Sequence, residues 1–230
     1  MAFGTFSASP KYFVPRLLGP FCQRFPGIDI SLKVTNHQQI QERMANNDDD
    51  LYIISTPPEQ PDLKIYPFLE NPLVVLGPQD HPLVGKPRSP IHILNGEQFI
   101  MREPGSGTRH AVQKLFAEHD VNVKVRLELG SNEAIKQAIA GGLGISVLSL
   151  HTIISEGTRG EFAILDVDHF PIDRHWYVAH LAGKQLSVVS QAFLNYLLEE
   201  SHTLVENLLP GISRAPAAID PKGAELLSKV

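Results

Sequence analysis

The sequence predicts an α/β protein built from two similar units. Short apolar runs typical of strands alternate with stretches whose apolar residues recur three or four positions apart, which is typical of helices. This order implies a mainly parallel sheet with right-handed crossovers. The pattern starts again near residue 98, and a last segment can return to the first unit.

The first half of the chain predicts a βαβαβ order. Ser9-Pro10 supplies an N-cap and a first-turn proline for a helix that Pro26-Gly27 stops near residue 25. Ile40 and Met44 lie one turn apart in a second, amphipathic helix over residues 36–46. Apolar alternation or short apolar runs predict strands over residues 3–7, 28–34, 51–55 and 73–76.

The second half repeats this order with clear helix boundaries. Ser106 is the predicted N-cap of a helix over residues 106–119, and Ser131 caps a helix over residues 131–140 that Gly141-Gly142 closes. Predicted strands cover residues 98–101, 123–129, 145–148, 162–167 and 172–181, and a helix covers residues 186–200. Beyond residue 201 we predict a short helix over 203–209, a loose linker over 213–221 and a final helix or frayed tail.

Composition excludes several classes of protein. The chain has 230 residues, 43% of them hydrophobic, and a formal net charge of −5, which argues against this polypeptide clamping nucleic acid by itself. A single cysteine, Cys22, excludes a disulfide scaffold or a cysteine zinc site within one chain, and we predict a buried thiol. The sequence has no secretory leader and no apolar run of about 18 residues, so a cytoplasmic location without membrane contact is predicted.

The run REPGSGTR, from Arg102 to Arg109, is the most informative motif. It places arginines, glycines, Ser106 and Thr108 around a predicted helix start, where unpaired N–H groups and the helix dipole favour an anion. Arginine can grip a phosphate or carboxylate with two hydrogen bonds. A small-anion receptor and a capped helix with solvated arginines explain the run equally well on residues alone.

Motifs for enzyme and metal chemistry are missing from the sequence. The ten histidines show no HExxH spacing, and His110 stands where a dinucleotide-binding run requires its third glycine. The Gly-x-Ser-x-Gly spacing of a nucleophile elbow and the Gly-Lys-Ser/Thr of a phosphate loop are absent. The acidic run at residues 48–50 is interpreted as a solvated turn. We therefore predict a protein that is not an enzyme and has no cofactor.

Several segments together resemble the effector-binding half of LysR-type transcription regulators. They are GSNEAIKQAIAGGLGISVL at residues 130–148, RFPGIDISL at residues 24–32 after the first helix, and DLYIIS at residues 50–55. REPGSGTR is similar to the CbbR/CmpR-like branch, which controls carbon-dioxide fixation and inorganic-carbon uptake genes. The resemblance spans roughly residues 3–200, and the pieces occur in the family's order.

The resemblance implies the fold of type 2 periplasmic binding proteins. Such a fold has two Rossmann-like subdomains joined by two crossing strands, with the ligand between them. We place subdomain I at residues 1–76 plus 166–200 and subdomain II at residues 77–165, with a C-terminal extension at residues 201–230. The N-terminal winged helix-turn-helix of the family is absent from this chain, so promoter DNA would be bound only through that missing domain.

The resemblance also implies a site for a phosphorylated effector, such as ribulose 1,5-bisphosphate or 2-phosphoglycolate. NADP and 2-oxoglutarate are lesser options. Helix starts at the carboxyl ends of strands would supply the contacts. The implied residues are Ser7, Ser9, Lys11, His37 and Thr56 from subdomain I, and Arg102, Gly105, Ser106, Gly107, Thr108, Arg109, Ser131 and Asn132 from subdomain II.

Each of these assignments has a structural alternative. Ser9 and Ser131 are also plain helix caps, Lys11 a solvated lysine, and His37 an ordinary loop histidine. Asn132 can stabilise a turn, and Arg109 can pair with Glu103 or Glu133 in a structural bridge. Among whole-protein functions we weigh a homodimeric or homotetrameric regulator, a transporter's solute-binding protein and an enzyme or regulatory subunit. The first is preferred.

Overall fold

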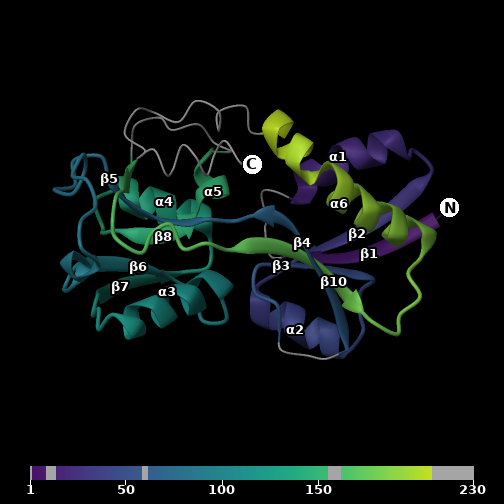
Figure 1. The fold of residues 1–230 in the computed structure, drawn as a ribbon, viewed down its shortest axis with the longest axis horizontal. Coiled ribbons are helices and arrows are strands. Elements are labelled where there is room, and N and C mark those ends of the chain that lie inside the picture. Colours follow the sequence, from purple (N-terminus) through teal and green to yellow (C-terminus); the bar gives the residue numbers. More distant parts are fainter. Residues whose placement is uncertain (1, 9–13, 59–61, 155–161, 209–230) are drawn as a thin grey trace. The chain divides into compact units, whose positions relative to one another are not determined.

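The computed structural model describes residues 2–8, 14–58, 62–154 and 162–208 (Figure 1). Contacts divide the described residues into two units: unit 1 contains those up to Glu70 and those from His175 onward, and unit 2 contains those from Asn71 to Arg174. The sequence placed these crossings near residues 76–78 and 166–168. They fall closer to the chain ends because β5 (Leu73–Pro78) pairs with strands of unit 2.

Unit 1 is built on one five-stranded sheet. Its strands are β1 (Ala2–Ala8), β2 (Ile28–Val34), β3 (Leu51–Ile54), β4 (Leu63–Glu70) and β10 (His175–Leu181), in the order β2-β1-β3-β10-β4. β1 runs parallel to β2 and β3, whereas β10 is antiparallel to β3 and β4. The prediction of a mainly parallel sheet is therefore wrong for this unit. The strand β10, which returns from the second half of the chain, pairs antiparallel with both of its neighbours.

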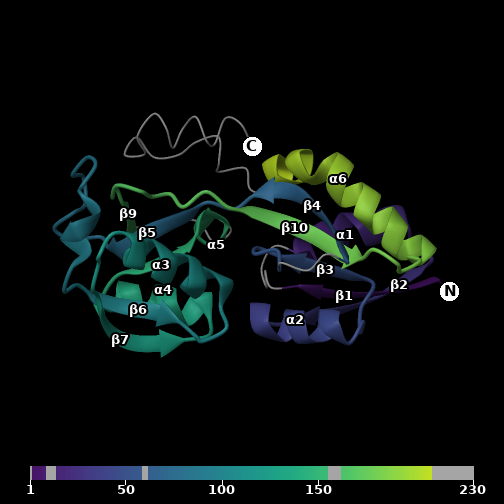
Figure 2. The same ribbon diagram turned by 60° about the horizontal axis from the view of Figure 1, so that its bottom comes forward.

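Helices cover both faces of this sheet (Figures 1 and 2). α1 (Val14–Arg24) and α6 (Val188–Leu208) lie on one face, where Phe6 of β1 stacks on Phe193 with ring centroids 4.8 Å apart. α2 (His37–Ala45) lies on the other face and packs Ile40 and Met44 against β3. Alternate side chains of the strands thus pack into two cores, one on each face, as a sheet covered by helices on both faces requires.

Three expectations for unit 1 need correction. Cys22 is exposed and not buried, because α1 buries the stripe Val14, Leu17 and Phe21, and position 22 lies beside that stripe. β4 was not predicted, because Pro67 interrupts its pattern; the strand tolerates this proline at the sheet edge, next to a bulge. α6 continues unbroken to Leu208, where a separate short helix was expected.

Unit 2 contains a three-stranded antiparallel sheet and a parallel pair of strands. β5 lies between β8 (Ser146–Ser149) and β9 (Phe162–Leu165), and β6 (Gln98–Arg102) pairs in parallel with β7 (Lys124–Leu129). The Ile100 N–H donates to the Ile145 carbonyl at 2.8 Å and links the two sheets. The remaining elements are η1 (Ile91–Leu94), α3 (Gly107–Glu118), α4 (Asn132–Ala140) and α5 (Leu150–Ile154).

Side chains of the unit 2 strands also pack into two separate hydrophobic cores. Phe99 and Met101 pack with Val112 and Phe116 of α3, while Ile100, between them, packs with Ile135 of α4. This alternation follows from the pleat, which sends successive side chains to opposite faces. It holds α3 and α4 against opposite faces of β6.

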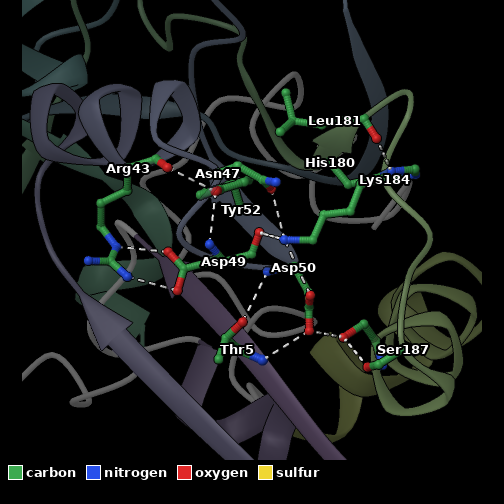
Figure 3. A network of polar contacts seen from close by, with 11 residues as sticks. Thr5, Arg43, Asn47, Asp49, Asp50, Tyr52, His180, Leu181, Lys184 and Ser187 are labelled. Atoms are coloured by element: carbon green, nitrogen blue, oxygen red, sulfur yellow. Dashed lines mark hydrogen bonds and ion pairs between the residues drawn. The ribbon is translucent and has the colours of Figure 1, made fainter.

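The acidic run at residues 48–50 is not the solvated turn we expected (Figure 3). Asp49 is 3% exposed and accepts two hydrogen bonds from the Arg43 guanidinium, at 2.8 and 2.9 Å. Asp50 accepts from the Ser190 hydroxyl at 2.8 Å and lies 3.4 Å from the Lys184 ammonium. The run therefore anchors the start of β3 to α2 and α6.

Replacing Tyr52 with phenylalanine is expected to lower the free energy of unfolding by about 2 kcal/mol. The buried Tyr52 hydroxyl accepts from the Asp49 N–H at 3.0 Å and donates to the Arg43 carbonyl at 3.1 Å. Its loss leaves both backbone groups without this partner. Urea unfolding measures the effect, with Tyr66→Phe on half-buried Tyr66 as the control. Equal stability of the two variants would contradict the role given to this hydroxyl.

Candidate anion-binding site

Two helix starts lie at one sheet edge in unit 2. β6 and β7 are parallel and in register at their carboxyl ends, where Arg102 pairs with Leu129. The helix after β6 is α3 and the helix after β7 is α4, so both helices begin at this edge. The predicted caps are confirmed: Ser106 accepts from the Arg109 N–H and Ser131 from the Ala134 N–H, each at 3.4 Å.

The start of α3 presents backbone donors. Its first intrahelical bond runs from the His110 N–H to the Ser106 carbonyl at 3.0 Å, and the Ser106 side chain caps Arg109. The N–H groups of Gly107 and Thr108 precede these bonds, so the helix supplies no acceptor for them. Gly105, with φ +81°, turns the chain into the helix. This geometry suits an oxyanion.

Arg102 is the last residue of β6, before the turn into α3, and its guanidinium is already engaged. Its Nε and Nη2 donate to the two carboxylate oxygens of Glu103 at 2.7 and 3.0 Å, and its Nη1 donates to Asn132 Oδ1 at 2.7 Å. The side chain is 16% exposed. Arg102 therefore joins the turn before α3 to the first residue of α4.

The side chain of Arg109 contacts the carboxyl ends of β6 and β7. Its Nη1 donates to the Arg102 carbonyl at 2.9 Å and to Glu128 of β7 at 2.8 Å. The structural bridge considered for Arg109 thus occurs with Glu128, and not with Glu103 or Glu133. In this arrangement Arg109 fixes the backbone of Arg102, and the two guanidinium groups bind different carboxylates, Glu128 and Glu103.

Asn132 connects the site to the segment after β8. Its Oδ1 accepts from Arg102, and its Nδ2 donates to the hydroxyl of Thr152 in α5 at 3.3 Å. Thr152 and Glu128 were not among the predicted site residues. Thr152 follows the carboxyl end of a third strand, β8, a position that could have suggested it.

The predicted site residues of unit 1 are placed separately. Ser7 lies in β1, where its backbone pairs with Lys33 and Tyr52, His37 is the half-buried first residue of α2, and half-buried Thr56 follows β3. Ser9 and Lys11 lie outside the described residues. The structure therefore brings together the predicted residues of unit 2: Arg102, Gly105, Ser106, Gly107, Thr108, Arg109, Ser131 and Asn132.

Unit 1 also carries a surface pocket of about 670 Å³ between β4, β10 and α6. Lys64, Tyr66 and His180 line it, and it contains none of the predicted site residues. Within the described ranges, no group of three or more His, Cys, Asp or Glu side chains is placed to hold a metal ion. In the same ranges, no helix has the length and apolar character to span a bilayer.

A pH-dependent ion pair lies on α4. Glu133 accepts from the Lys136 ammonium at 2.8 Å, and this bond, followed by one from Gln137, lowers the pKa of Glu133 below its ordinary value of 4.5. A carboxylate with a depressed folded-state pKa adds stability above its unfolded pKa and loses it as pH falls through the folded value.

Glu133→Gln is therefore expected to be less stable than the wild type at neutral pH, by about 1 kcal/mol or more, because the Lys136 side chain, only 2% exposed, loses its charged partner even though Glu133 itself is 46% exposed. The difference should shrink as the pH falls below the ordinary pKa of 4.5 and vanish once the pH is below the lowered pKa of Glu133. Urea titrations at several pH values measure it, with Glu118→Gln, from an exposed pair with Lys114 at 3.9 Å, as the control. A stability gap that persists in acid would contradict the linkage.

Comparison with known proteins gives consistent matches along the chain. The family model described as "LysR substrate binding domain" matches residues 2–201. The transcriptional activator CmpR of Synechocystis is 54% identical over 187 residues, which cover 81% of this chain and 62% of that protein. The RuBisCO operon transcriptional regulator of Acidithiobacillus ferrooxidans is 48% identical over 194 residues, which cover 84% of this chain and 63% of that protein. The chain thus spans less than two thirds of these relatives.

Solved structures agree with the sequence relatives. The regulatory domain of Synechocystis CcmR, in complex with 2-phosphoglycolate, is 65% identical with a TM-score of 0.83, covering 86% of this chain and 96% of that one. The effector-binding domain of QuiR is 23% identical with a TM-score of 0.76, and the match covers 87% of this chain and 97% of that one. At this identity it supports the fold alone. The predicted type 2 periplasmic-binding fold and the CbbR/CmpR-like resemblance are confirmed. The chain belongs to the LysR family of transcription regulators and carries its substrate-binding domain.

Proposed function

We propose that this chain senses a phosphorylated metabolite, 2-phosphoglycolate first and ribulose 1,5-bisphosphate second, for a regulator of carbon-fixation or carbon-uptake genes. The observation that carries this proposal is the 65% identity with a CcmR regulatory domain in complex with 2-phosphoglycolate. The start of α3 adds a physical reason, since its backbone donors follow Arg102 by five and six residues in the chain, and the proposal adds the Arg102 guanidinium to them.

In the proposed complex, the phosphate lies at the start of α3. The N–H groups of Gly107 and Thr108 donate to its oxygens, and Arg102 turns part of its hydrogen bonding from Glu103 to the ligand. Each charge-assisted hydrogen bond contributes about 1.5–3 kcal/mol when it is well formed. Several such bonds give affinity on the order of micromolar, despite the formal net charge of −5.

The proposal for the whole protein goes further. The relatives are DNA-binding regulators longer than this chain, so we propose that promoter DNA is bound by a separate N-terminal domain and that the protein works in the cytoplasm as a homodimer or homotetramer. Effector binding would then change how the DNA-binding domains are presented. The proposal includes a sensing role without catalysis, which the regulator names of the same relatives support, and these names do not favour the transporter alternative.

Isothermal titration with 2-phosphoglycolate, ribulose 1,5-bisphosphate and inorganic phosphate tests the proposal. We expect saturable binding of an organic phosphate at least about tenfold tighter than that of inorganic phosphate, because the carbon skeleton adds contacts that phosphate lacks. Equal affinity for all three ligands would reduce the site to an unspecific anion site. No binding of either organic phosphate would overturn the proposed ligand class.

A further inference from the structure

Two chain segments of unit 2, Asn71–Leu73 and Ile172–Arg174, form a short antiparallel ribbon where the chain enters and leaves the unit; we call it the crossing ribbon. The Asn71 N–H donates to the Arg174 carbonyl at 2.6 Å. Leu73 and Ile172 exchange two backbone hydrogen bonds, at 3.1 and 2.9 Å. The chain divides directly beyond this ribbon, after Glu70 and after Arg174. Any signal that leaves unit 2 along the backbone therefore passes through it.

Arg174 ties the crossing ribbon to the start of α3. Its half-buried side chain donates from Nη1 to the carbonyl of Gly107 at 2.8 Å, across 67 positions of sequence. Gly107 is buried and is the first residue of α3. The same residue thus holds the ribbon through its own carbonyl and the helix start through its guanidinium.

The other strand of the ribbon is tied to the start of α4. The Ser149 hydroxyl, at the end of β8, donates to Asn71 Oδ1 at 2.6 Å, and both residues are buried. Thr152, three residues further, accepts from Asn132, which in turn accepts from Arg102. The start of α3 is thus bonded directly to the ribbon, and the start of α4 is connected to it through the short backbone segment between Ser149 and Thr152.

The contact at Gly107 has a particular chemical consequence. The Gly107 carbonyl and the Thr108 N–H belong to the same planar peptide group and point in opposite directions. A cation on the carbonyl polarises this group and makes its N–H a stronger donor, and an anion on the N–H strengthens the carbonyl as an acceptor in return. Arg174 and an anion at Thr108 therefore reinforce each other without touching.

We propose that Arg174 is a positioning residue of the effector site: it orients and polarises the Gly107–Thr108 peptide and relays occupancy of the site to the crossing ribbon. This inference rests on the proposed function, in which a phosphorylated effector binds at the start of α3. It assigns two roles to Arg174: a contribution to the affinity for the effector, and the connection between the start of α3 and the crossing ribbon at the boundary of unit 2.

The test compares Arg174→Met and Arg174→Lys with the wild-type chain and with Arg126→Met, which removes an arginine from the exposed surface of β7. Titration gives the affinity for 2-phosphoglycolate. Hydrogen exchange with and without saturating 2-phosphoglycolate gives the protection of the ribbon amides of Asn71, Leu73 and Ile172. Thermal unfolding confirms that each variant is folded.

We expect Arg174→Met to weaken 2-phosphoglycolate binding about fivefold and to abolish the ligand-induced protection of the ribbon even at saturation. Arg174→Lys should restore part of both effects, and Arg126→Met should behave as the wild type. Full ligand-induced protection of the ribbon in Arg174→Met would overturn the relay, although the proposed function would stand. Unchanged affinity would overturn the positioning role. Failure of the wild type to bind 2-phosphoglycolate would remove the proposed function, and this inference with it.

Discussion

Arg102→Met is expected to weaken 2-phosphoglycolate binding by about tenfold or more, which corresponds to about 1.4 kcal/mol. Arg102 supplies the guanidinium that the proposal places on the phosphate, and Asn132 at the start of α4 holds it. Its replacement removes charge-assisted hydrogen bonds to the ligand and leaves the Glu103 carboxylate beside the bound anion. Isothermal titration measures the loss, with Arg126→Met as the charge-matched control.

A second substitution, at Glu103, separates the effect of the Arg102 guanidinium from that of the carboxylate paired with it. Glu103→Gln keeps Arg102 and removes the carboxylate that occupies its Nε and Nη2 donors. This variant should bind 2-phosphoglycolate more tightly than the wild type, because the ligand no longer competes with an internal anion. If Arg102→Met binds as well as the wild type, the phosphate does not lie where we place it.

Gly144→Ala is expected to destabilise the protein by about 3 kcal/mol or more. Gly144 has φ +144°, and an added Cβ would lie 2.3 Å from the carbonyl oxygen of Gln98, well inside contact distance. The Gln98 carbonyl accepts from the Ile145 N–H at 2.9 Å. The clash would therefore push apart the link between β6 and the segment leading into β8.

Two glycines of the same chain are the controls for this variant. Gly142 has φ +70° with no atom within 4 Å of an added Cβ, so Gly142→Ala reports backbone strain alone, at about 1 kcal/mol. Gly183 has the same open space without a positive φ, and Gly183→Ala should be close to neutral. Urea unfolding ranks the three variants. A Gly144→Ala loss no larger than that of Gly142→Ala would show that the backbone relaxes around the clash.

The features that could be predicted from sequence are those with local causes. Ser106 and Ser131 were recognised as caps because a cap acts on residues two or three positions further along the chain. The strand-helix order of both units has the same local origin, in apolar periodicity. Local signals therefore located the two helix starts on which the candidate site rests.

What could not be predicted depends on long-range contacts. The antiparallel return of β10 joins residues more than a hundred positions apart, and β4 was hidden by Pro67. Asp49 was expected in solvent because its acidic neighbours suggest a turn, but Arg43 holds it in the interior. Arg174 had no motif of its own, since its contact with Gly107 is created only by the fold.

If the phosphate binds as proposed, the ion pair between Arg102 and Glu103 sets the effector concentration at which the site fills. Because the arginine already holds an internal anion, a ligand enters by exchange, and its affinity reflects the difference between two ion pairs. Ligands that offer only a single weak charge, such as chloride or acetate, gain little from that exchange. In the proposed complex this exchange sets a threshold: the site discriminates against singly charged anions and fills when an organic phosphate, with two or more negative charges, accumulates. Glu103 would then set the concentration range over which the proposed site responds.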